Sequence, residues 1–378
     1  MHDDSYYIGR PDFYFEEPLT NVNAIDDLYT FTEKNRSYLN LPADLDFIWF
    51  KTEPRRLYGD KIGDTLFKIK RALRNDTQLI LLWAGESNVM LDDQMVANLN
   101  EFCESISNPV MLITGVLGDW QKEWEGKLNF YLCTLMYFEY ESGYEWDMSY
   151  DTTNHSRTKK FMSMGTKDYP NRKYLLSKIL TNNLAEDGYV SYACLGGGDL
   201  ALAHFSREEQ DKINRVAAFA DVHLPLPTID SSPDAWTRMP REFLTNSYVN
   251  MVTDTWFEHW GNTTFISEKV FNAMVHQQMF IMMSPPHTLK QLRDSGYKTF
   301  HPYIDESYDN IENNYDRLKA VTEIFINFVA QPIEKIQEVY MQCLPILEHN
   351  MQRVKSKPTS KILEMHMRKA INEKTQTN

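Results

Sequence analysis

A short segment in the second half of the chain places two opposite charges at the expected start of a helix. The run FISEKVFNAM spans residues 265–274, and Ser267 is a residue type that favours the position just before a helix. Glu268 and Lys269 follow it, and apolar residues then recur at helical spacing. Because a helix N-terminus carries roughly half a positive charge, a lysine there is disfavoured unless an anion binds nearby.

A second expected helix also begins with cations. The strand-like run KKFMSMG at 159–165 leads through TKDYPN to Arg172 and Lys173, which open a helix over 171–182. Both helices follow a strand and a loop, so their N-termini belong at the sheet edge where open α/β proteins bind ligands. We therefore treat the two helix starts as one candidate anion site.

Pyrophosphate suits such a site, because backbone N–H groups, helix dipoles and the side chains of Arg172 and Lys269 can converge on it. Glu268 can then accept hydrogen bonds from ribose hydroxyls while Lys269 meets the phosphates. The alternative for each residue is an exposed first-turn side chain that is tolerated at small cost. The residues alone leave both interpretations open.

The surrounding elements alternate between apolar strands and helices, which predicts parallel sheets covered by helices. Before residue 140, strands are expected at 46–50, 78–83, 109–114 and 129–135, and helices at 62–73 and 93–105. After residue 158, strands are expected at 160–164, 189–193, 248–253, 279–283 and 297–300, and helices at 171–182, 206–220, 267–276 and 287–295. From Asn314 onward we expect helices that cap the second domain.

The length of the chain allows more than one domain. Its 378 residues are 42% hydrophobic, which is enough to form two cores. The polar, turn-rich stretch 140–159 is a candidate linker. We expect an N-terminal α/β domain over 1–150, a C-terminal α/β domain over 151–330 that holds the nucleotide, and a helical segment over 331–378.

Two segments of the second half resemble known glycosyltransferases. The run YVNMVTDTWFEHWGNTTFISEKVFNAMVHQQMFIMM at 248–283 resembles the donor-binding region of α1,3-fucosyltransferase-like enzymes, where a Thr-Glu-Lys triplet opens a helix. Here serine replaces the threonine. That run with its continuation to residue 318, and KKFMSMGTKDYPNRKYLLSKIL at 159–180, are more closely similar to glycosyltransferase-like proteins of tailed bacteriophages. Those proteins commonly have asparagine where this chain has Gly165.

The resemblance implies a GT-B arrangement, in which two Rossmann-like α/β domains face each other across a cleft and a helical tail follows. The C-terminal domain would hold a nucleotide sugar, and the N-terminal domain would hold the acceptor. Arg172 and Lys269 would bind the diphosphate and Glu268 the ribose, while Asp254 and Asn262 are further candidates for the nucleotide or sugar. The residues implied in nucleotide-sugar binding are Arg172, Asp254, Asn262, Ser267, Glu268 and Lys269.

Glycosyl transfer needs a stabilised diphosphate leaving group and, for inversion, a base that deprotonates the acceptor hydroxyl. Candidate bases follow strands of the N-terminal domain: first Glu86 in AGES, second Asp119 in GVLGDW, and third Glu53. Each of them has the alternative interpretation of a solvated loop carboxylate.

The sequence shows no metal-binding pattern. A metal-dependent GT-A enzyme would show Asp-X-Asp after a strand, whereas Asp92-Asp93 stand at an expected helix start, where capping explains them better. The ten histidines show no HxxxH or HExxH spacing, and the four cysteines form no CxxC pair. We expect neither a metal nor a cofactor, with a UDP- or GDP-linked sugar as the co-substrate.

The overall charge bears on partners and location. The chain has 53 acidic and 39 basic residues and a net charge of -14, which opposes binding to a polyanion unless basic residues gather on one face. No apolar run approaches the roughly 20 residues that span a bilayer, and the N-terminus lacks the pattern of a secretory signal. We expect no membrane partner and a cytoplasmic location, in the host cytoplasm if the protein comes from a phage.

The sequence therefore predicts an inverting, metal-independent glycosyltransferase that moves a hexosyl or pentosyl group from a nucleotide sugar. Its acceptor is open between a hydroxymethylated base of phage DNA, which the resemblance suggests, and a glycan or cell-surface acceptor. The rival from another class is a non-catalytic protein that binds a nucleotide sugar without turning it over.

Overall fold

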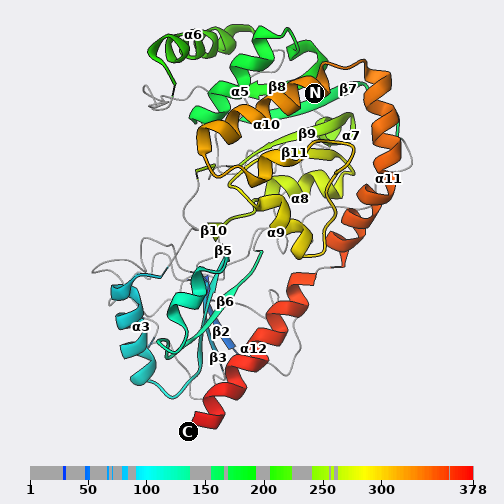
Figure 1. Ribbon diagram of the computed structural model, residues 1–378. Coiled ribbons are helices and arrows are strands. Elements are labelled where there is room, and N and C mark those ends of the chain that lie inside the picture. The colour runs from blue at the N-terminus through cyan, green and yellow to red at the C-terminus, as the bar shows by residue number, and fades with distance from the viewer. Residues whose placement is uncertain are drawn as a thin grey trace, which may run out of the picture. The chain divides into compact units, whose positions relative to one another are not determined.

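A computed structural model provides the fold (Figure 1). It describes residues 29–30, 47–51, 66–67, 70, 79–83, 91–136, 155–165, 169–192, 205–223, 241–254, 257–258, 263–356 and 358–377. These residues form two compact units. The first unit contains the described residues between 11 and 144, residues 263–266 and residues 358–377, and the second contains those between 145 and 260 and residues 267–356.

The first unit is built on a mostly parallel sheet with the strand order β1-β2-β3-β4-β6. Its strands are β1 Tyr29–Thr30, β2 Phe47–Lys51, β3 Leu79–Trp83, β4 Val110–Thr114 and β6 Tyr131–Thr134. Only β1 runs antiparallel to its neighbour. A separate pair, β5 Leu117–Gly118 and β10 Thr263–Thr264, is antiparallel, and the 3-10 helix η2 Trp120–Trp124 follows β5.

Helix α3, Asp93–Glu104, covers one face of this sheet because its apolar residues lie on one stripe. Met95, Leu99 and Phe102 are buried against Leu82 and Leu112. The helix starts in the way that its sequence predicts, since the carboxylate of Asp92 accepts a hydrogen bond from the backbone N–H of Met95 at 2.7 Å. Capping, the favoured interpretation of the Asp92-Asp93 pair, is confirmed.

The last helix, α12 Pro358–Thr377, also belongs to the first unit. Its buried residues Leu363, Met367 and Ala370 lie three and four positions apart, and the helix contacts β3 and β4. The phenol oxygen of Tyr131 lies 2.7 Å from Nδ1 of His366 and ties the helix to β6. The expected helical cap on the second domain therefore does not hold for α12, because its apolar stripe covers the first sheet.

The second unit contains a fully parallel sheet with the order β11-β9-β7-β8. Its strands are β7 Lys159–Gly165, β8 Gly188–Tyr192, β9 Ser247–Thr253 and β11 Met279–Met283. Its helices are α5 Pro170–Thr181, η3 Ala185–Asp187, α6 Arg207–His223, α7 Arg241–Thr245, α8 Glu268–Val275, α9 Thr288–Asp294, η4 Ser307–Asn310, α10 Asn314–Val329 and α11 Ile333–Lys355.

The chain reverses its direction of travel across this sheet between β7 and β9. From β7 it passes through α5 to β8 on one side, whereas from β9 it passes through α8 to β11 on the other side. Right-handed crossovers in opposite directions place α5 and α8 on opposite faces. The crevice at the carboxyl ends of β7 and β9 is thus a topological switch point, where open α/β sheets bind their ligands.

Both faces of the second sheet are covered. Helix α10 contacts α5, and its Phe325 packs edge-on against Phe161 of β7 with ring centroids 5.2 Å apart. Helix α11 contacts α8, and its Tyr340 packs against Tyr248 of β9 with centroids 5.2 Å apart. Arg157 fixes this second layer, because its guanidinium donates hydrogen bonds to backbone carbonyls in α7, at the first residue of β9 and after α8, and to the Tyr340 hydroxyl.

The predicted fold class is confirmed: the protein is α/β, with one mostly parallel and one fully parallel sheet covered by helices and a helical C-terminal part. One predicted strand, 297–300, is wrong. The side-chain amide of Asn350 bonds the N–H and C=O of Lys298 at 2.9 and 2.8 Å, and the N–H of Phe300 donates to Glu306 at 2.6 Å. These side chains occupy the backbone groups that a neighbouring strand would need. Most of the helix expected at 62–73 and of the linker expected at 140–159 lies outside the described residues.

Candidate anion-binding site

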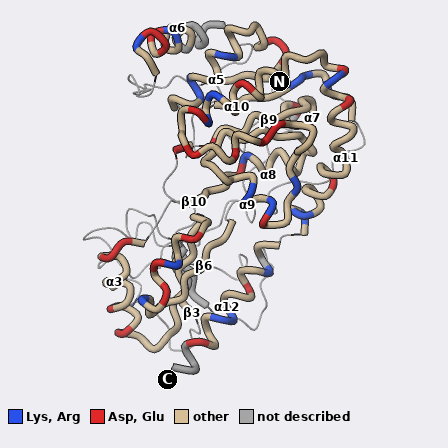
Figure 2. The backbone as a smooth tube through the Cα atoms, viewed as in Figure 1, with Lys and Arg blue, Asp and Glu red and all other residues tan. Residues whose placement is uncertain are grey.

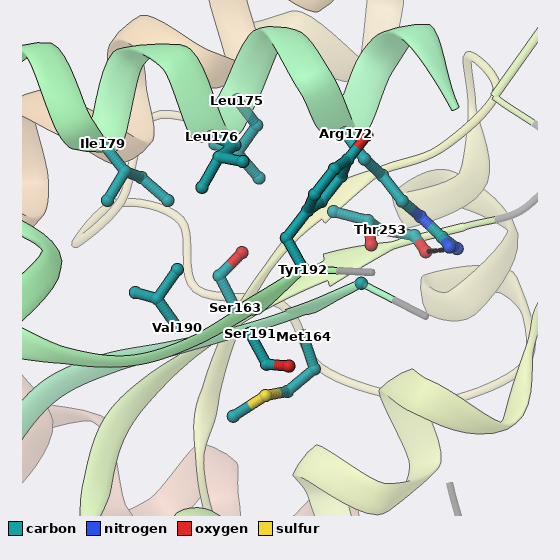
Figure 3. Close-up of a pocket in the computed structure, with 11 residues that line it drawn as sticks. Ser163, Met164, Arg172, Leu175, Leu176, Ile179, Val190, Ser191, Tyr192 and Thr253 are labelled. Carbon is teal, nitrogen blue, oxygen red and sulfur yellow. Dashed lines mark hydrogen bonds between the residues drawn. The ribbon is translucent and has the colours of Figure 1, made fainter. Parts of the chain in front are cut away.

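Arg172 lies at the switch point, in the first turn of α5. The residue before the helix, Tyr169, makes no side-chain capping bond, and Pro170 occupies the first helical position. Arg172 is 4% exposed, and its guanidinium donates a hydrogen bond to the carbonyl of Thr253 at the end of β9, at 3.0 Å (Figure 3). It also lies 5.0 Å from the ring centroid of Tyr169. Helix α5 is thereby joined to the end of β9.

Gly165 provides room for this arrangement. A Cβ at Gly165 would lie 3.2 Å from Cδ2 of Tyr192 and 3.6 Å from Cδ of Arg172. The asparagine that is common at this position in the resembling phage proteins would therefore press on the Tyr192 ring. In this chain the space is used for packing between the strand end and the arginine stem.

Asp254 directly follows β9 and is joined to the start of α8. It is 1% exposed, and its Oδ1 accepts a hydrogen bond from the hydroxyl of Ser267. Its second oxygen, Oδ2, is buried and has no hydrogen-bond partner among the described residues. Ser267 is the N-cap residue of α8 as predicted, but its hydroxyl makes no capping bond because it is directed to Asp254.

The first turn of α8 contains an ion pair. Nζ of Lys269 lies 2.7 Å from Oε1 of Glu268, and the side chains are 28% and 10% exposed respectively. The predicted conflict between Lys269 and the helix dipole is therefore partly relieved within the protein by Glu268. The lysine remains the more accessible of the two charges.

Burial and neighbouring charges set the ionisation of the site. Burial raises the pKa of Asp254 to about 6, against the opposing influence of Lys269, the Ser267 hydrogen bond and Arg172. Burial also lowers the pKa of Arg172, while Asp254 and Glu268 act in the opposite direction. Arg172, Asp254, Glu268 and Lys269 thus lie within electrostatic reach of one another, on two helix starts and one strand end.

A small pocket opens beside Arg172, between α5 and the ends of β7, β8 and β9 (Figure 3). It has about 250 Å³ of empty space, part of which is open solvent. It is lined by Ser163, Met164, Gly165, Arg172, Leu175, Leu176, Ile179, Val190, Ser191, Tyr192 and Thr253. Helix α5 contributes Leu175, Leu176 and Ile179 to the wall and the strand ends contribute most of the rest, so the Arg172 guanidinium is the charged group among the lining residues.

The structure brings together five of the six predicted binding residues, and their roles in binding stay predictions. Asp254, Ser267, Glu268 and Lys269 cluster with Arg172, whereas Asn262 lies outside the described residues. The first and third candidate bases, Glu86 and Glu53, also lie outside them.

Asp119, the second candidate base, lies in the first unit just after β5. Its carboxylate is 72% exposed and lies 2.9 Å from Nζ of Lys122. The structure shows a solvated ion pair at this position, and a catalytic role for Asp119 stays a prediction.

Three residues that complete the site were not predicted from the sequence. Thr253 accepts from Arg172, Tyr169 lies over its guanidinium, and Tyr192 lines the pocket. The Tyr-Pro pair at the start of α5 and the tyrosine at the end of β8 were the signals available for the two aromatic residues.

No group of three or more His, Cys, Asp or Glu is placed to hold a metal ion within the part of the chain that the structure describes. Metal independence stays a prediction. No helix among the described residues is long and apolar enough to cross a membrane.

Comparison with known proteins adds a likeness of fold. No family model matches the chain, and no curated protein matches it. Among solved structures it is similar to that of the DNA modifying enzyme β-glucosyltransferase, determined in the presence and absence of its substrate uridine diphosphoglucose. The likeness covers 86% of this chain and 99% of that chain, with 12% sequence identity and a TM-score of 0.38. The roles of individual residues rest on the site itself.

Proposed function

We propose that this protein is a glycosyltransferase that binds the diphosphate of a nucleotide sugar at the starts of α5 and α8. The observation that carries the proposal is the joining of these two helix starts at one switch point. Arg172 bonds the carbonyl at the end of β9, and Asp254, the next residue after β9, bonds Ser267 at the start of α8. Neither helix has a side-chain cap, so backbone N–H groups in the first turn of each helix could donate hydrogen bonds to a phosphate.

The charges at the site suit a diphosphate leaving group. Arg172 can donate hydrogen bonds from a fixed planar group, and Lys269 supplies a second, more exposed cation. Glu268, next to Lys269, can accept hydrogen bonds from ribose hydroxyls. Two cations and two helix dipoles would stabilise the charge that develops as the glycosidic bond breaks, so the proposed reaction needs no metal.

The acceptor step is proposed to invert the sugar configuration, with Glu86 or Asp119 as the base that takes the proton of the acceptor hydroxyl. The GT-B arrangement, the α1,3-fucosyltransferase-like character of the donor region and the domain bounds near residues 150 and 330 belong to the same proposal. They rest on the resemblance of residues 158–320.

Two classes of acceptor are proposed, a hydroxymethylated base in DNA and a glycan. The resemblance to phage proteins favours DNA, whereas the net charge of -14 opposes it. Charges of both signs alternate along α12, while α3 has only acidic charges (Figure 2). Transfer of radiolabelled sugar to hydroxymethylated DNA or to oligosaccharides separates the two classes, and a DNA acceptor predicts a rate that falls steeply with salt.

Isothermal titration with UDP, GDP and their sugars, in a buffer with a metal chelator, tests the donor site. The panel includes uridine diphosphoglucose, the substrate of the DNA β-glucosyltransferase described above. We expect Lys269→Ala and Arg172→Ala each to weaken nucleotide binding by about 10- to 100-fold, because a hydrogen bond to a charged group is worth about 1.5 to 3 kcal/mol.

The matched control is Lys290→Ala on α9. Lys290 forms an exposed ion pair with Asp294 at 2.5 Å, so its loss should leave nucleotide binding unchanged. The donor site is rejected if no nucleotide binds, or if Lys269→Ala binds as tightly as the wild type. Binding of a nucleotide sugar without release of nucleotide, across DNA and glycan acceptors, would instead favour the non-catalytic binder.

A further inference from the structure

The two residues assigned to the ribose and the diphosphate are bonded to each other. Nζ of Lys269 lies 2.7 Å from Oε1 of Glu268, and Glu268 is the more buried partner. The Lys269 ammonium group is thus already hydrogen-bonded to a carboxylate, and this bond must break before the group can bind a phosphate. A diphosphate that arrives alone must therefore compete with Glu268 for the lysine.

The rest of the site adds to this competition. Arg172 and Lys269 provide two positive charges, and Asp254 and Glu268 provide two negative charges when ionised. Asp254 is fully buried and held by Ser267, so it cannot move away from an incoming anion. Glu268 is on the first turn of α8 and is paired with a lysine side chain that is 28% exposed, so it is the carboxylate whose partner can change.

We infer that Glu268 is a specificity-determining residue that makes a ribose a condition for binding a diphosphate, and this inference rests on the proposed function. Without a ribose, Glu268 holds Lys269 and keeps it from the phosphate. A ribose gives the carboxylate two hydroxyl donors in place of the lysine, which then turns to the diphosphate. Inorganic diphosphate has no pair of ribose hydroxyls to replace the lysine. The site thus selects nucleoside diphosphates, the donor's leaving group, over free pyrophosphate.

Titration of pyrophosphate and UDP into the full-length protein, with a metal chelator, tests this inference. Glu268→Gln removes the charge and keeps the length of the side chain. We expect it to bind pyrophosphate about fivefold more tightly, which is the upper range for a partly exposed pair, and to bind UDP about tenfold more weakly. Its preference for UDP over pyrophosphate should therefore shrink by about 50-fold.

A second variant gives an independent measurement that does not require Glu268→Gln to fold. If Glu268 holds the lysine, Lys269→Ala should weaken UDP binding by about tenfold or more but pyrophosphate binding by less than about threefold. A lysine that simply contacts phosphate would lose the same factor for both ligands. In the double variant, the gain in pyrophosphate affinity should vanish, since it depends on the released lysine.

Glu338→Gln is the matched control, because it removes the acid of an exposed Lys335–Glu338 pair on α11 and should change neither affinity. If UDP binds the wild type but Glu268→Gln leaves pyrophosphate affinity unchanged, or Lys269→Ala weakens both ligands equally, the inference is overturned and the donor site stands. If the wild type binds neither UDP nor any nucleotide sugar, the proposed function fails and the inference fails with it.

Discussion

Helix starts in this protein follow two patterns. At α3 and α10 a side chain closes the first turn: Asp92 accepts one backbone N–H and Asn313 accepts two. At α6 the Ser206 hydroxyl accepts from the N–H of Glu209, whose carboxylate accepts from the N–H of Ser206. At α5 and α8, no side chain makes such a bond. The capped helices satisfy their own N-termini, whereas the helices at the switch point do not.

The contrast is sharpest at Ser267, because serine is a good capping residue in the correct position. Its hydroxyl bonds Asp254 instead, and α8 is left without a side-chain cap. A missing cap is not by itself a sign of function, since Pro332 before α11 makes no side-chain capping bond either, and Glu334 lies in the first turn of that helix. What distinguishes α5 and α8 is the combination of an open start, a cation and a place at the switch point. Ser267 is thus a typical capping residue by type and position, but its hydroxyl does not cap the helix.

The largest expected effect concerns Asp254. Burial raises its pKa to about 6 from 3.8, so the folded state binds the proton more tightly than the unfolded state. The free energy of unfolding should therefore fall as pH rises from about 4 to about 6, by about 3 kcal/mol for two pKa units, and then level off. Asp254→Asn keeps an oxygen for Ser267 but cannot ionise. Urea unfolding at stepped pH should show the variant gaining stability over the wild type across this window.

If the free energy of unfolding depends on pH in the same way for Asp254→Asn and the wild type, the buried carboxylate does not destabilise the fold. The proposed difference between α8 and the capped helices would then be wrong. The switch-point residues would then be ordinary structural residues like those of the capped helices. Asp309→Asn is a useful second titration. Burial raises the pKa of Asp309 as well, but both of its oxygens accept backbone N–H groups at the start of α9.

A capped helix should respond in the opposite way. Asn313→Ala removes the side chain that accepts from the N–H groups of Tyr315 and Asp316, both at 3.0 Å. We expect a loss of about 1 kcal/mol in the free energy of unfolding, measured by urea denaturation, with no change in nucleotide affinity. A change in affinity on this substitution would mean that capped and open helix starts do not differ in function.

The smallest expected effect is at the start of α5. The ring of Tyr169 lies 5.0 Å from the Arg172 guanidinium, and Tyr169→Leu removes this contact while keeping an apolar side chain. Because a cation–π contact is worth about 0.5 to 1 kcal/mol at a partly exposed site, nucleotide binding should weaken by about two- to fivefold. Titration calorimetry measures the change, and an unaltered affinity would limit the role of α5 to Arg172 itself.

Much of the fold could be predicted from sequence because the buried strands are short, apolar and separated by helices of clear periodicity. The strand at 279–283 was predicted to the residue. The failures come from hydrogen bonds made by other segments of the chain, most of which are distant in sequence. The run 297–300 was predicted as a strand, but Asn350 and Glu306 bond its backbone groups. The pairing of β5 with β10 joins residues far apart in the chain and has no local signal.

The candidate site could be predicted only in part, because some of its contacts join segments that are distant in sequence. The helix starts carry a local signal, so Arg172, Ser267, Glu268 and Lys269 could be found from residue type and spacing. That Ser267 bonds Asp254, and that Arg172 reaches Thr253, depends on how β9 lies between the two helices. The roles of all these residues in binding stay predictions until a nucleotide is titrated.

The packing of α12 has a consequence for how the chain folds during synthesis. The sheet of the first unit is made early, but the helix that contacts β3 and β4 comes from residues 358–377. The first unit therefore cannot be completed until the end of synthesis, after the residues of the second unit have been made. A fragment that ends near residue 150 would leave apolar residues such as Met111 and Ile113 without that layer and should aggregate when expressed alone.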